Sequence, residues 1–383
     1  MMIWCTLGEY EGASFYIILH LMKLWAVLFL IIPIFGVFYV LWHVWNILPL
    51  PVTVKVIVVT LLAMALACLF YNFIVGLDDI PLWVARSIYE TGTSSLFVLL
   101  YAVMLFLVLD VLRITGILPL SFLYSSVAGS VFVIVFLCIV FALGNVNYQQ
   151  KIRRNISLRA ATPLKRPLKL VMMSDIHLGY HITRNELAHW VDLVNKEKPD
   201  AVLIAGDVID ISVVPVEKEN MAAEMRRIKV PVYVCPGNHE YYSGIDKAEK
   251  FFREAEMILL RDSCAVIGGE LTVIGRDDRT NLSRKSVAEL VRKAPKTKYT
   301  VLLDHQPYHL GRTAKAGVDF QFSGHTHYGQ VWPVSWIENI IYENAFGAKT
   351  IGRTHFYVSS GIGIWGGKFR IGTCSEYVVA EVW

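Results

Sequence analysis

The sequence predicts an N-terminal transmembrane region of about four helices, residues 1–150, followed by an α/β domain, residues 168–383. Three observations support this division. The chain of 383 residues is 55% hydrophobic with a mean hydropathy of +0.48, which is too apolar for one soluble domain. Charged residues are scarce in the first 150 residues. After Leu168, short apolar strands alternate with amphipathic helices, a pattern typical of an α/β domain.

Four apolar segments in the N-terminal part are long enough to cross a bilayer core, which needs about 20 residues. A buried helical core is a poor alternative because no polar segments would remain to cover it. A cleavable signal peptide would not recur four times. We therefore expect a multi-pass integral membrane protein with a polar loop between the second and third spans. The predicted spans are Leu24–Trp45, Val52–Phe73, Ser94–Leu112 and Phe122–Leu143.

A basic stretch follows the fourth segment, and we predict that residues 151–167 form a basic linker. The positive-inside rule places this stretch and the following domain in the cytoplasm, at the inner membrane of a bacterium. The same stretch could instead bind anionic lipid head groups on either face of the membrane. The six cysteines show no metal-site spacing, and no basic-aromatic pattern indicates nucleic acid. Nothing in the sequence indicates the oligomeric state.

Polar side chains follow five predicted strands at the point where each strand ends. The strands are Leu168–Met173, Ala201–Ala205, Val230–Cys235, Tyr299–Leu303 and Phe320–Phe322. The polar segments that follow are Ser174-Asp175-Ile176-His177, Gly206-Asp207, Gly237-Asn238-His239-Glu240, Asp304-His305 and Gly324-His325-Thr326-His327. In open α/β sheets, functional groups collect beyond such strand ends.

Each of these segments alone could be a turn or a helix cap, and a lone histidine is more often a core residue than a ligand. Five in matching positions favour a metal site, because burying so many acids and imidazoles without a cation is costly. Carboxylate, imidazole and amide donors without thiolate suit Mn, Fe, Zn or Mg. Seven candidate ligands exceed the needs of one ion and indicate two, about 3.5–4 Å apart, suited to in-line hydrolysis of a phosphoester.

The ordered blocks Asp-x-His, Gly-Asp, Gly-Asn-His-Glu, His and Gly-His-x-His resemble the signature of the calcineurin-like metallophosphoesterase superfamily. The resemblance covers about Leu168–Trp383, and it is strongest with the membrane-linked YkuE/YaeI-like and transmembrane metallophosphoesterase branch. That closer resemblance depends on four further segments, Asp304–Pro307, Ser323–Gln330, Tyr357–Gly363 and Arg370–Glu376. It does not extend to the first 150 residues.

The resemblance implies a four-layer αββα sandwich and two divalent metal ions, with manganese favoured. It implies that one metal is held by Asp175, His177 and His327, the other by Asn238, His305 and His325, and that Asp207 bridges them. His239 would face the substrate, stabilising the transition state or protonating the leaving oxygen, and Glu240 would orient its imidazole.

Two features depart from the family pattern. Tyr328 stands where a glycine is usual, so a phenol could line the substrate rim, bind a phosphate or simply pack. Residues 331–351, which include Trp332 and Trp336, are unusually apolar for a segment beside a phosphate site. They could form an amphipathic helix packed on the sheet, or a lid that enters the membrane interface and admits an acyl chain.

We therefore expect a membrane-anchored, dinuclear metal-dependent phosphoester hydrolase. Its expected substrate is a lipid or lipid-linked phosphoester or pyrophosphate, such as the UDP-diacylglucosamine lipid A precursor that the family branch implies. One alternative is a water-soluble substrate, with the helices serving as a simple anchor. Another is a non-catalytic membrane regulator that retains the fold.

Overall fold

The computed structural model describes residues 34–383, which fall into two compact units. One unit comprises the described residues up to Ala67 together with Ser95–Ile139, and the other comprises Cys68–Ser94 together with Val140–Trp383. The chain therefore passes between the units three times. The second unit contains the whole α/β domain and two segments from the helical region.

Among residues 34–383, three helices are long and apolar enough to cross a membrane, as expected of a membrane protein. They are α2 (Val52–Ile74), α3 (Leu82–Ile114) and α4 (Val127–Gln149). A shorter apolar helix spans Ile34–Ile47. It covers the end of the predicted span Leu24–Trp45, whose beginning lies outside the described residues, so four membrane helices are not established. The 3₁₀ turn η2 (Leu120–Phe122) lies between α3 and α4.

The first unit has a small apolar core that surrounds one polar cluster. Asp110 accepts a hydrogen bond of 2.7 Å from the Tyr39 hydroxyl, and its carboxylate lies 3.0 Å from Nε2 of His43. The His43 ring stacks on Phe106 at a centroid distance of 4.4 Å. These contacts join the helix Ile34–Ile47 to α3 and satisfy polar groups in an apolar region.

Helix α3 begins at Leu82, whereas the sequence predicted a loop up to Ser94. At about 1.5 Å per residue, its 33 residues exceed the ~30 Å bilayer core. Arg86 and Glu90 interrupt the apolar pattern in the first turns of α3, and for this reason the sequence predicted a loop there. They are helical because Ala85 and Tyr89 are buried within the second unit.

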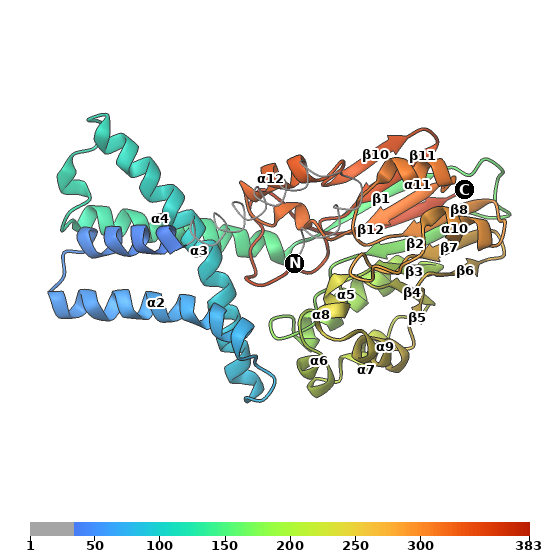
Figure 1. Ribbon diagram of the computed structural model, residues 1–383, viewed down its shortest axis with the longest axis horizontal. Helices are drawn as coiled ribbons and strands as arrows, with labels where there is room; N and C mark the ends of the chain where they lie inside the picture. Colours follow the sequence, from blue (N-terminus) through green and yellow to red (C-terminus); the bar gives the residue numbers. More distant parts are fainter. Residues whose placement is uncertain (1–33) are drawn as a thin grey trace, which may run out of the picture. The chain divides into compact units, whose positions relative to one another are not determined.

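The α/β domain contains two six-stranded mixed sheets (Figure 1). In the first sheet, β2, β3, β4 and β5 are parallel, and β12 pairs antiparallel with β2. Its order is β1 (Lys151–Leu158), β12 (Ser375–Val382), β2 (Leu168–Met173), β3 (Ala201–Ala205), β4 (Val232–Cys235), β5 (Ile258–Leu259). In the second sheet the four inner strands are parallel, with an antiparallel strand at each edge. Its order is β10 (Gly347–Ile351), β11 (Thr354–Val358), β9 (Phe320–Ser323), β8 (Tyr299–Leu303), β7 (Leu271–Gly275), β6 (Ser263–Ile267).

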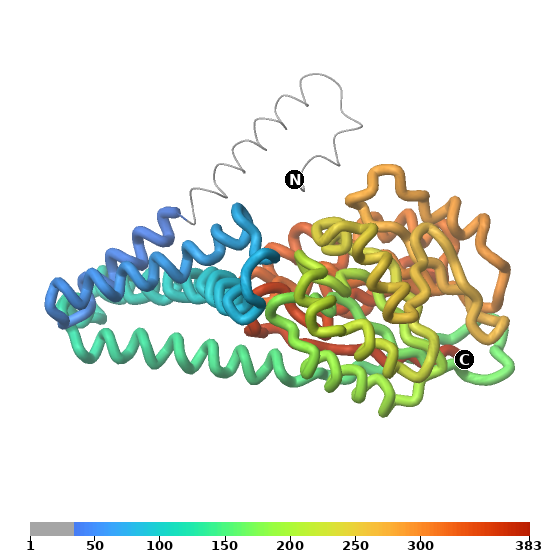
Figure 2. Tube along the Cα trace, turned by 90° about the horizontal axis from the view of Figure 1, so that it is seen from below, coloured from blue at the N-terminus to red at the C-terminus, as the bar shows by residue number. Residues whose placement is uncertain are grey.

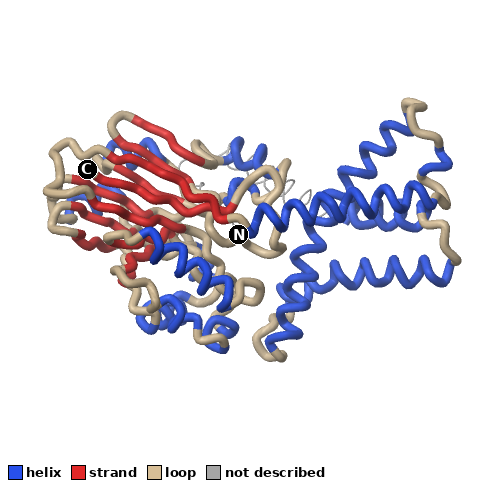
Figure 3. The backbone as a smooth tube through the Cα atoms, turned by 180° about the vertical axis from the view of Figure 1, so that it is seen from behind, coloured by secondary structure: helices blue, strands red, loops and turns tan. Residues whose placement is uncertain are grey.

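The two sheets pack face to face, and helices cover their outer faces (Figure 3). The core between the sheets includes Leu170 and Leu203 of the first sheet and Val301 and Phe320 of the second. The helices of the domain are α5 (Arg184–Glu197), α6 (Val214–Lys218), α7 (Met221–Met225), α8 (Asn238–Tyr242), α9 (Ile245–Glu254), α10 (Val287–Lys293), α11 (Leu310–Ala316), η3 (His327–Gly329) and α12 (Val334–Ile341). This is the layered arrangement that the sequence led us to expect.

The stretch predicted as a basic linker contributes strand β1, which follows α4 directly (Figure 2). β1 pairs in parallel with β12 along its whole length, from Lys151 opposite Ser375 to Leu158 opposite Val382. Two of its basic side chains form ion pairs, Arg153 with Glu197 and Arg154 with Glu376. The sequence did not predict this strand because its arginines obscured the alternation of Ile152, Ile156 and Leu158.

Candidate metal centre

The polar residues at five strand ends come together in the structure. Because β2, β3 and β4 are parallel neighbours, their carboxyl ends lie at one edge of the first sheet. The ends of β8 and β9 bring in the corresponding segments from the second sheet. Three groups of donor atoms result among the described residues. Two consist of predicted ligands, Asp175, His177 and His327 in the first cluster and Asp207, His305 and His325 in the second, and the remaining group, His177, Asp210 and His239, shares His177 with the first cluster.

In the first cluster, the Nε2 atoms of His177 and His327 lie 3.0 Å apart. The Nε2 atom of His327 lies 3.6 Å from Oδ1 of Asp175. Asp175 and His177 are fully buried, and His327 is partly exposed. Three donor atoms converging on one point is the arrangement that a bound divalent cation requires.

In the second cluster, Oδ2 of Asp207 lies 3.0 Å from Nε2 of His305. The same oxygen is 3.8 Å from Nε2 of His177, so Asp207 stands between the two clusters. Asn238 is also buried, and its Oδ1 has no hydrogen-bond partner among residues 34–383. A buried carbonyl oxygen without a donor is costly unless a ligand binds it.

The donor set fits two divalent cations. Burial, reinforced by the nearby His305, lowers the pKa of His325 to about 3, so this imidazole is neutral, as a metal ligand must be. Nδ1 of His305 lies 2.7 Å from the carbonyl oxygen of Ala205, which leaves Nε2 directed at the site. Carboxylate, imidazole and amide donors suit Mn, Fe, Zn or Mg, and the structure does not select among them.

The backbone at the site is held in strained conformations. Five of the candidate ligands have positive φ angles, between 48° and 73°, namely Asp175, His177, Asp207, His325 and His327. Side chains other than glycine rarely adopt this region, and such strain clusters at functional sites. Two glycines permit the close approach of the carboxylates: a Cβ on Gly237 would lie 2.2 Å from Oδ1 of Asp207, and one on Gly324 2.2 Å from Oδ2 of Asp175.

Glu240, which we expected to orient His239, is directed at backbone amides instead. Its Oε1 accepts hydrogen bonds from Val208 (2.8 Å) and Ile209 (3.0 Å). Its Oε2 accepts from Gly237 (2.6 Å) and Asp207 (3.0 Å). Glu240 therefore holds the turn after β3 in the shape that presents Asp207.

The structure places Asp210, and not Glu240, against the imidazole of His239. Oδ1 of Asp210 lies 3.0 Å from Nδ1 of His239 and 3.2 Å from Nδ1 of His177. Burial alone would lower the pKa of His239, but the carboxylates of Asp207 and Asp210 outweigh it and raise the pKa to about 9. These two carboxylates thus favour the protonated imidazole.

Sequence reasoning missed two supporting residues. Asp210 follows Asp207 at a spacing of three, and the Gly-Asp-x-x-Asp pattern could have drawn attention to it. Arg370 is fully buried and donates to the carbonyl oxygens of His327 (2.8 Å) and Gly363 (2.8 Å). Arg370 belongs to the segment Arg370–Glu376 that carried the closer resemblance, but its supporting role was not foreseen because His327 and Gly363 lie in other loops.

The expected rim residues pack around η3 and α12. The Tyr328 ring stacks on Phe346 at a centroid distance of 4.9 Å, which favours the packing interpretation. Trp332 and Trp336 meet edge to face at 5.3 Å. Helix α12 exposes its apolar side chains, with Trp336 61% and Ile340 85% exposed, instead of packing them on the sheet.

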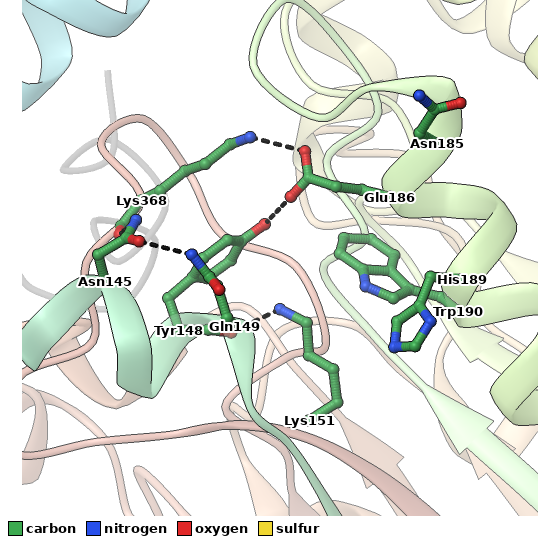
Figure 4. A pocket seen from close by; sticks show the side chains of 9 residues that line it. All are labelled: Asn145, Tyr148, Gln149, Lys151, Asn185, Glu186, His189, Trp190 and Lys368. Atoms are coloured by element: carbon green, nitrogen blue, oxygen red, sulfur yellow. Dashed lines mark hydrogen bonds and ion pairs between the residues drawn. The ribbon is translucent and has the colours of Figure 1, made fainter.

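A separate cavity of about 490 Å³ lies between the end of α4 and helix α5 (Figure 4). Residues of the two metal clusters do not line it. Lys368 forms an ion pair of 2.6 Å with Glu186 at its edge, and Lys151 lies 3.7 Å from the ring centroid of Tyr148 and 4.9 Å from that of Trp190. The lining residues are Asn145, Tyr148, Gln149, Lys151, Asn185, Glu186, His189, Trp190 and Lys368.

Replacing Lys151 by methionine should stabilise the protein. Burial, reinforced by the charge of Arg370, lowers the pKa of Lys151 from 10.5 to about 6. Between these values the unfolded chain binds a proton that the folded chain does not, so stability rises with pH over this window. Lys151→Met removes the cost of burying the ammonium, and we expect a melting temperature in detergent about 2–4 °C higher at pH 6.

The advantage of Lys151→Met should shrink as the pH rises toward 10.5, above which the lysine is neutral in the unfolded chain as well as in the folded protein. Lys196→Met, at an exposed position on α5, serves as the control and should show no such pH dependence. A Lys151→Met variant that is less stable than the wild type at pH 6 would show that the contacts of the ammonium with the two rings outweigh its burial.

A family model described as calcineurin-like phosphoesterase matches residues 168–329. An uncharacterized metallophosphoesterase of Helicobacter pylori strain J99 is 32% identical over 219 residues, covering 56% of this chain and 59% of the relative. A bovine transmembrane protein with metallophosphoesterase domain is 27% identical over 233 residues, covering 56% of this chain and 52% of the relative. The uncharacterized metallophosphoesterase YkuE of Bacillus subtilis is 27% identical over 213 residues, covering 51% of this chain and 72% of the relative.

The match to the family model, residues 168–329, includes the five strand ends at which the two clusters lie. The chain spans little more than half the length of the Helicobacter and bovine relatives that it matches.

Proposed function

Residues 168–329 form a calcineurin-like phosphoesterase domain, and from this premise we propose that the protein is a membrane-anchored, dinuclear metal-dependent hydrolase of lipid-linked phosphoesters or pyrophosphates. The observation that carries the lipid assignment is the exposed apolar face of α12, which contacts the turn η3 that follows His325.

In this proposal, Asp175, His177 and His327 hold one cation, and Asn238, His305 and His325 hold the other. Asp207, which stands between the clusters, is a ligand of both. When bound, the two cations supply Lewis-acid activation of water and neutralise negative charge on the phosphoryl group.

His239 acts as the general acid. As the oxygen of water bonds to phosphorus and the bond from phosphorus to the leaving oxygen breaks, Nε2 of His239 gives its proton to that oxygen. Asp210 orients the imidazole from Nδ1 and keeps it protonated. The side chain of His239 is 12% exposed, whereas that of Asp210 is fully buried. Of the two, His239 therefore has the access to solvent that a group in contact with substrate requires.

Helix α12 is connected to the end of α4 through the loop segment Arg370–Ile371, and all of these residues belong to the second unit. The backbone of Arg370 donates to the carbonyl oxygen of Gly144 in α4 (2.9 Å), and Asn147 of α4 donates to the carbonyl oxygen of Arg370 (2.9 Å). The next residue, Ile371, accepts from the backbone of Trp332 (2.7 Å), just before α12 begins. The segment Arg370–Ile371 thus links the end of α4 to the residues just before α12.

The run of basic residues in the sequence directly after α4, residues 151–169, supports a cytoplasmic catalytic domain by the positive-inside rule. A substrate of the cytoplasmic leaflet, such as a nucleotide-linked lipid A precursor, then has access to the site. A reporter fused after Trp383 measures the orientation, and an external signal would overturn this part of the proposal.

The lipid assignment is tested with CDP-diacylglycerol carrying either hexanoyl or oleoyl chains, so that the reacting group stays constant. The full-length protein is assayed in mixed micelles with manganese. We expect Trp336→Gln combined with Ile340→Gln to lower the ratio of kcat/KM on the oleoyl substrate to kcat/KM on the hexanoyl substrate by about tenfold, because about 1.4 kcal/mol of apolar contact is lost.

Leu282→Gln is the matched control, since Leu282 is 81% exposed, close to the 85% of Ile340, but lies in the loop after β7. It should leave the ratio unchanged. An unchanged ratio in the α12 variant, with bis(4-nitrophenyl) phosphate hydrolysed in preference to both lipids, would favour a water-soluble substrate and a simple anchor. Absence of hydrolysis for all three compounds with manganese bound would favour the non-catalytic regulator.

A further inference from the structure

The segment between α2 and the middle of α3 is part of the phosphoesterase unit. Leu77, Ala85 and Tyr89 form a buried apolar cluster with Tyr180 of the catalytic domain. The guanidinium of Arg86 donates to the carbonyl oxygen of Tyr180 (2.8 Å) and forms an ion pair with Glu219.

A second set of polar contacts fixes the start of the same segment. Asp78 accepts hydrogen bonds from the hydroxyl of Ser212 (2.5 Å) and from that of Tyr180. Ser212 lies two residues after Asp210, so the segment is joined directly to the loop that follows the metal ligand Asp207.

Tyr89 extends from α3 to the carboxylate that supports the catalytic histidine. Its hydroxyl donates a 2.5 Å hydrogen bond to Oδ2 of Asp210, and both residues are fully buried. Its ring stacks on that of His181, with a centroid distance of 5.1 Å and an interplanar angle of 22°. The stacking contact with His181 and the hydrogen bond to Asp210 together define where the hydroxyl points.

The two oxygens of Asp210 have separate partners. Oδ1 faces Nδ1 of His239 and Nδ1 of His177, as described above. Oδ2 takes the hydroxyl of Tyr89, while the other nearby donor, Nδ1 of His181, is 3.9 Å away and out of hydrogen-bonding range. Within the described chain, Tyr89 thus supplies the hydrogen bond that holds Oδ2 in place.

We propose that Tyr89, contributed by the membrane-region helix α3, is a positioning residue of the active site that acts through Asp210 on His239 and on the metal ligand His177. This inference rests on the proposed function. It assigns the helical region a part in catalysis in addition to anchoring, because the hydrogen bond exists only when the start of α3 is docked on the catalytic domain.

Loss of the Tyr89 hydroxyl leaves one oxygen of a fully buried carboxylate without a donor. The carboxylate then gains by rotating toward His181 or by admitting water, and either change loosens its contacts at Oδ1. His239 would be less well placed to protonate a leaving group. His177 would lose support for its metal-directed nitrogen, an effect that typically weakens metal binding.

The test compares Tyr89→Phe with the wild type in the full-length protein. Methyl phenyl phosphate needs protonation of its leaving group, and methyl 4-nitrophenyl phosphate needs it far less. At saturating manganese, we expect kcat on the phenyl ester to fall about tenfold and kcat on the nitrophenyl ester to fall less than about threefold, with KM within about twofold. Manganese titration, read without substrate, should show binding weakened by about three- to tenfold.

Tyr180→Phe is the matched control, because it removes a phenol from the same contact surface while Ser212 still binds Asp78. It should behave as the wild type in both measurements. Equal losses on the two esters together with a lowered melting temperature, or wild-type manganese binding and kinetics in Tyr89→Phe, would overturn the proposal. If the wild type binds manganese but hydrolyses neither ester, the proposed function fails. The positioning role of Tyr89 is then tested only by whether Tyr89→Phe weakens manganese binding.

A double-mutant cycle with Asp210→Asn tests whether Tyr89 acts through Asp210. If Tyr89 acts through Asp210, Tyr89→Phe should add less than about a twofold further loss in the Asp210→Asn background. Additive losses from the two substitutions would show that Tyr89 acts by another path and would overturn the assignment.

Discussion

Asp207→Ala should remove metal-dependent hydrolysis almost completely, lowering kcat/KM by at least about 10³-fold. Asp207 is the carboxylate that stands between the two clusters, with Oδ2 3.0 Å from Nε2 of His305 and 3.8 Å from that of His177. Its loss removes a ligand from both cations and leaves buried imidazoles close together without a shared anion. We expect the purified variant to retain much less than the two equivalents of manganese expected for the wild type, as measured by elemental analysis.

The control for this prediction is Asp192→Ala, since Asp192 is an exposed carboxylate on α5 that pairs with Arg227. It should retain both activity and metal. Hydrolysis of bis(4-nitrophenyl) phosphate at wild-type rates by Asp207→Ala, with manganese added, would contradict the dinuclear assignment. Both variants should remain membrane-inserted, because neither position lies in a membrane helix.

His239→Ala should lower kcat by about 10²–10⁴-fold while leaving the metal content intact. The imidazole lies at the opening of the site and is held by Asp210 at Nδ1, 3.0 Å away, so its other nitrogen is free to serve as the acid. The pKa of about 9 keeps it protonated at neutral pH. The loss should be larger for esters with poor leaving groups, because these depend most on protonation.

His189→Ala, at an exposed position on α5, is the matched control and should leave kcat unchanged. A loss of bound manganese in His239→Ala comparable to that in Asp207→Ala would instead make His239 a ligand. A loss of the same size for activated and unactivated esters would argue against its role as the general acid.

The metal centre could be predicted from the sequence because its signals are local. Strands β2, β3 and β8 occur at the residues predicted, and a polar ligand follows each of them. A parallel sheet brings such strand ends to one edge whatever the details of packing. Strand order therefore predicts that the candidates after β2, β3 and β4 lie together, whereas the packing of the two sheets brings in those after β8 and β9. The metal-binding roles of all seven remain for the experiments above.

The membrane helices α2 and α4 were likewise predictable, since hydropathy is a property of consecutive residues. Where polar residues interrupted the pattern, the prediction was wrong. The start of α3 read as a loop because of Arg86 and Glu90, and β1 read as a linker because of its arginines. In both cases the partners that neutralise or cover these side chains lie far away in the chain, Glu219 for Arg86 and Glu376 for Arg154.

The sequence by itself thus indicated the two-part architecture and the positions of the candidate ligands at the strand ends, and it suggested the reaction class that we propose. Only the tertiary structure decided which acid serves His239, because Glu240 is adjacent in sequence but directed at backbone amides, while Asp210 reaches the imidazole across the turn after β3. It also decided that Tyr89 of a membrane-region helix reaches Asp210. The physical reason is that side-chain direction and long-range docking depend on how separate elements pack, and residue order does not encode that in any local pattern.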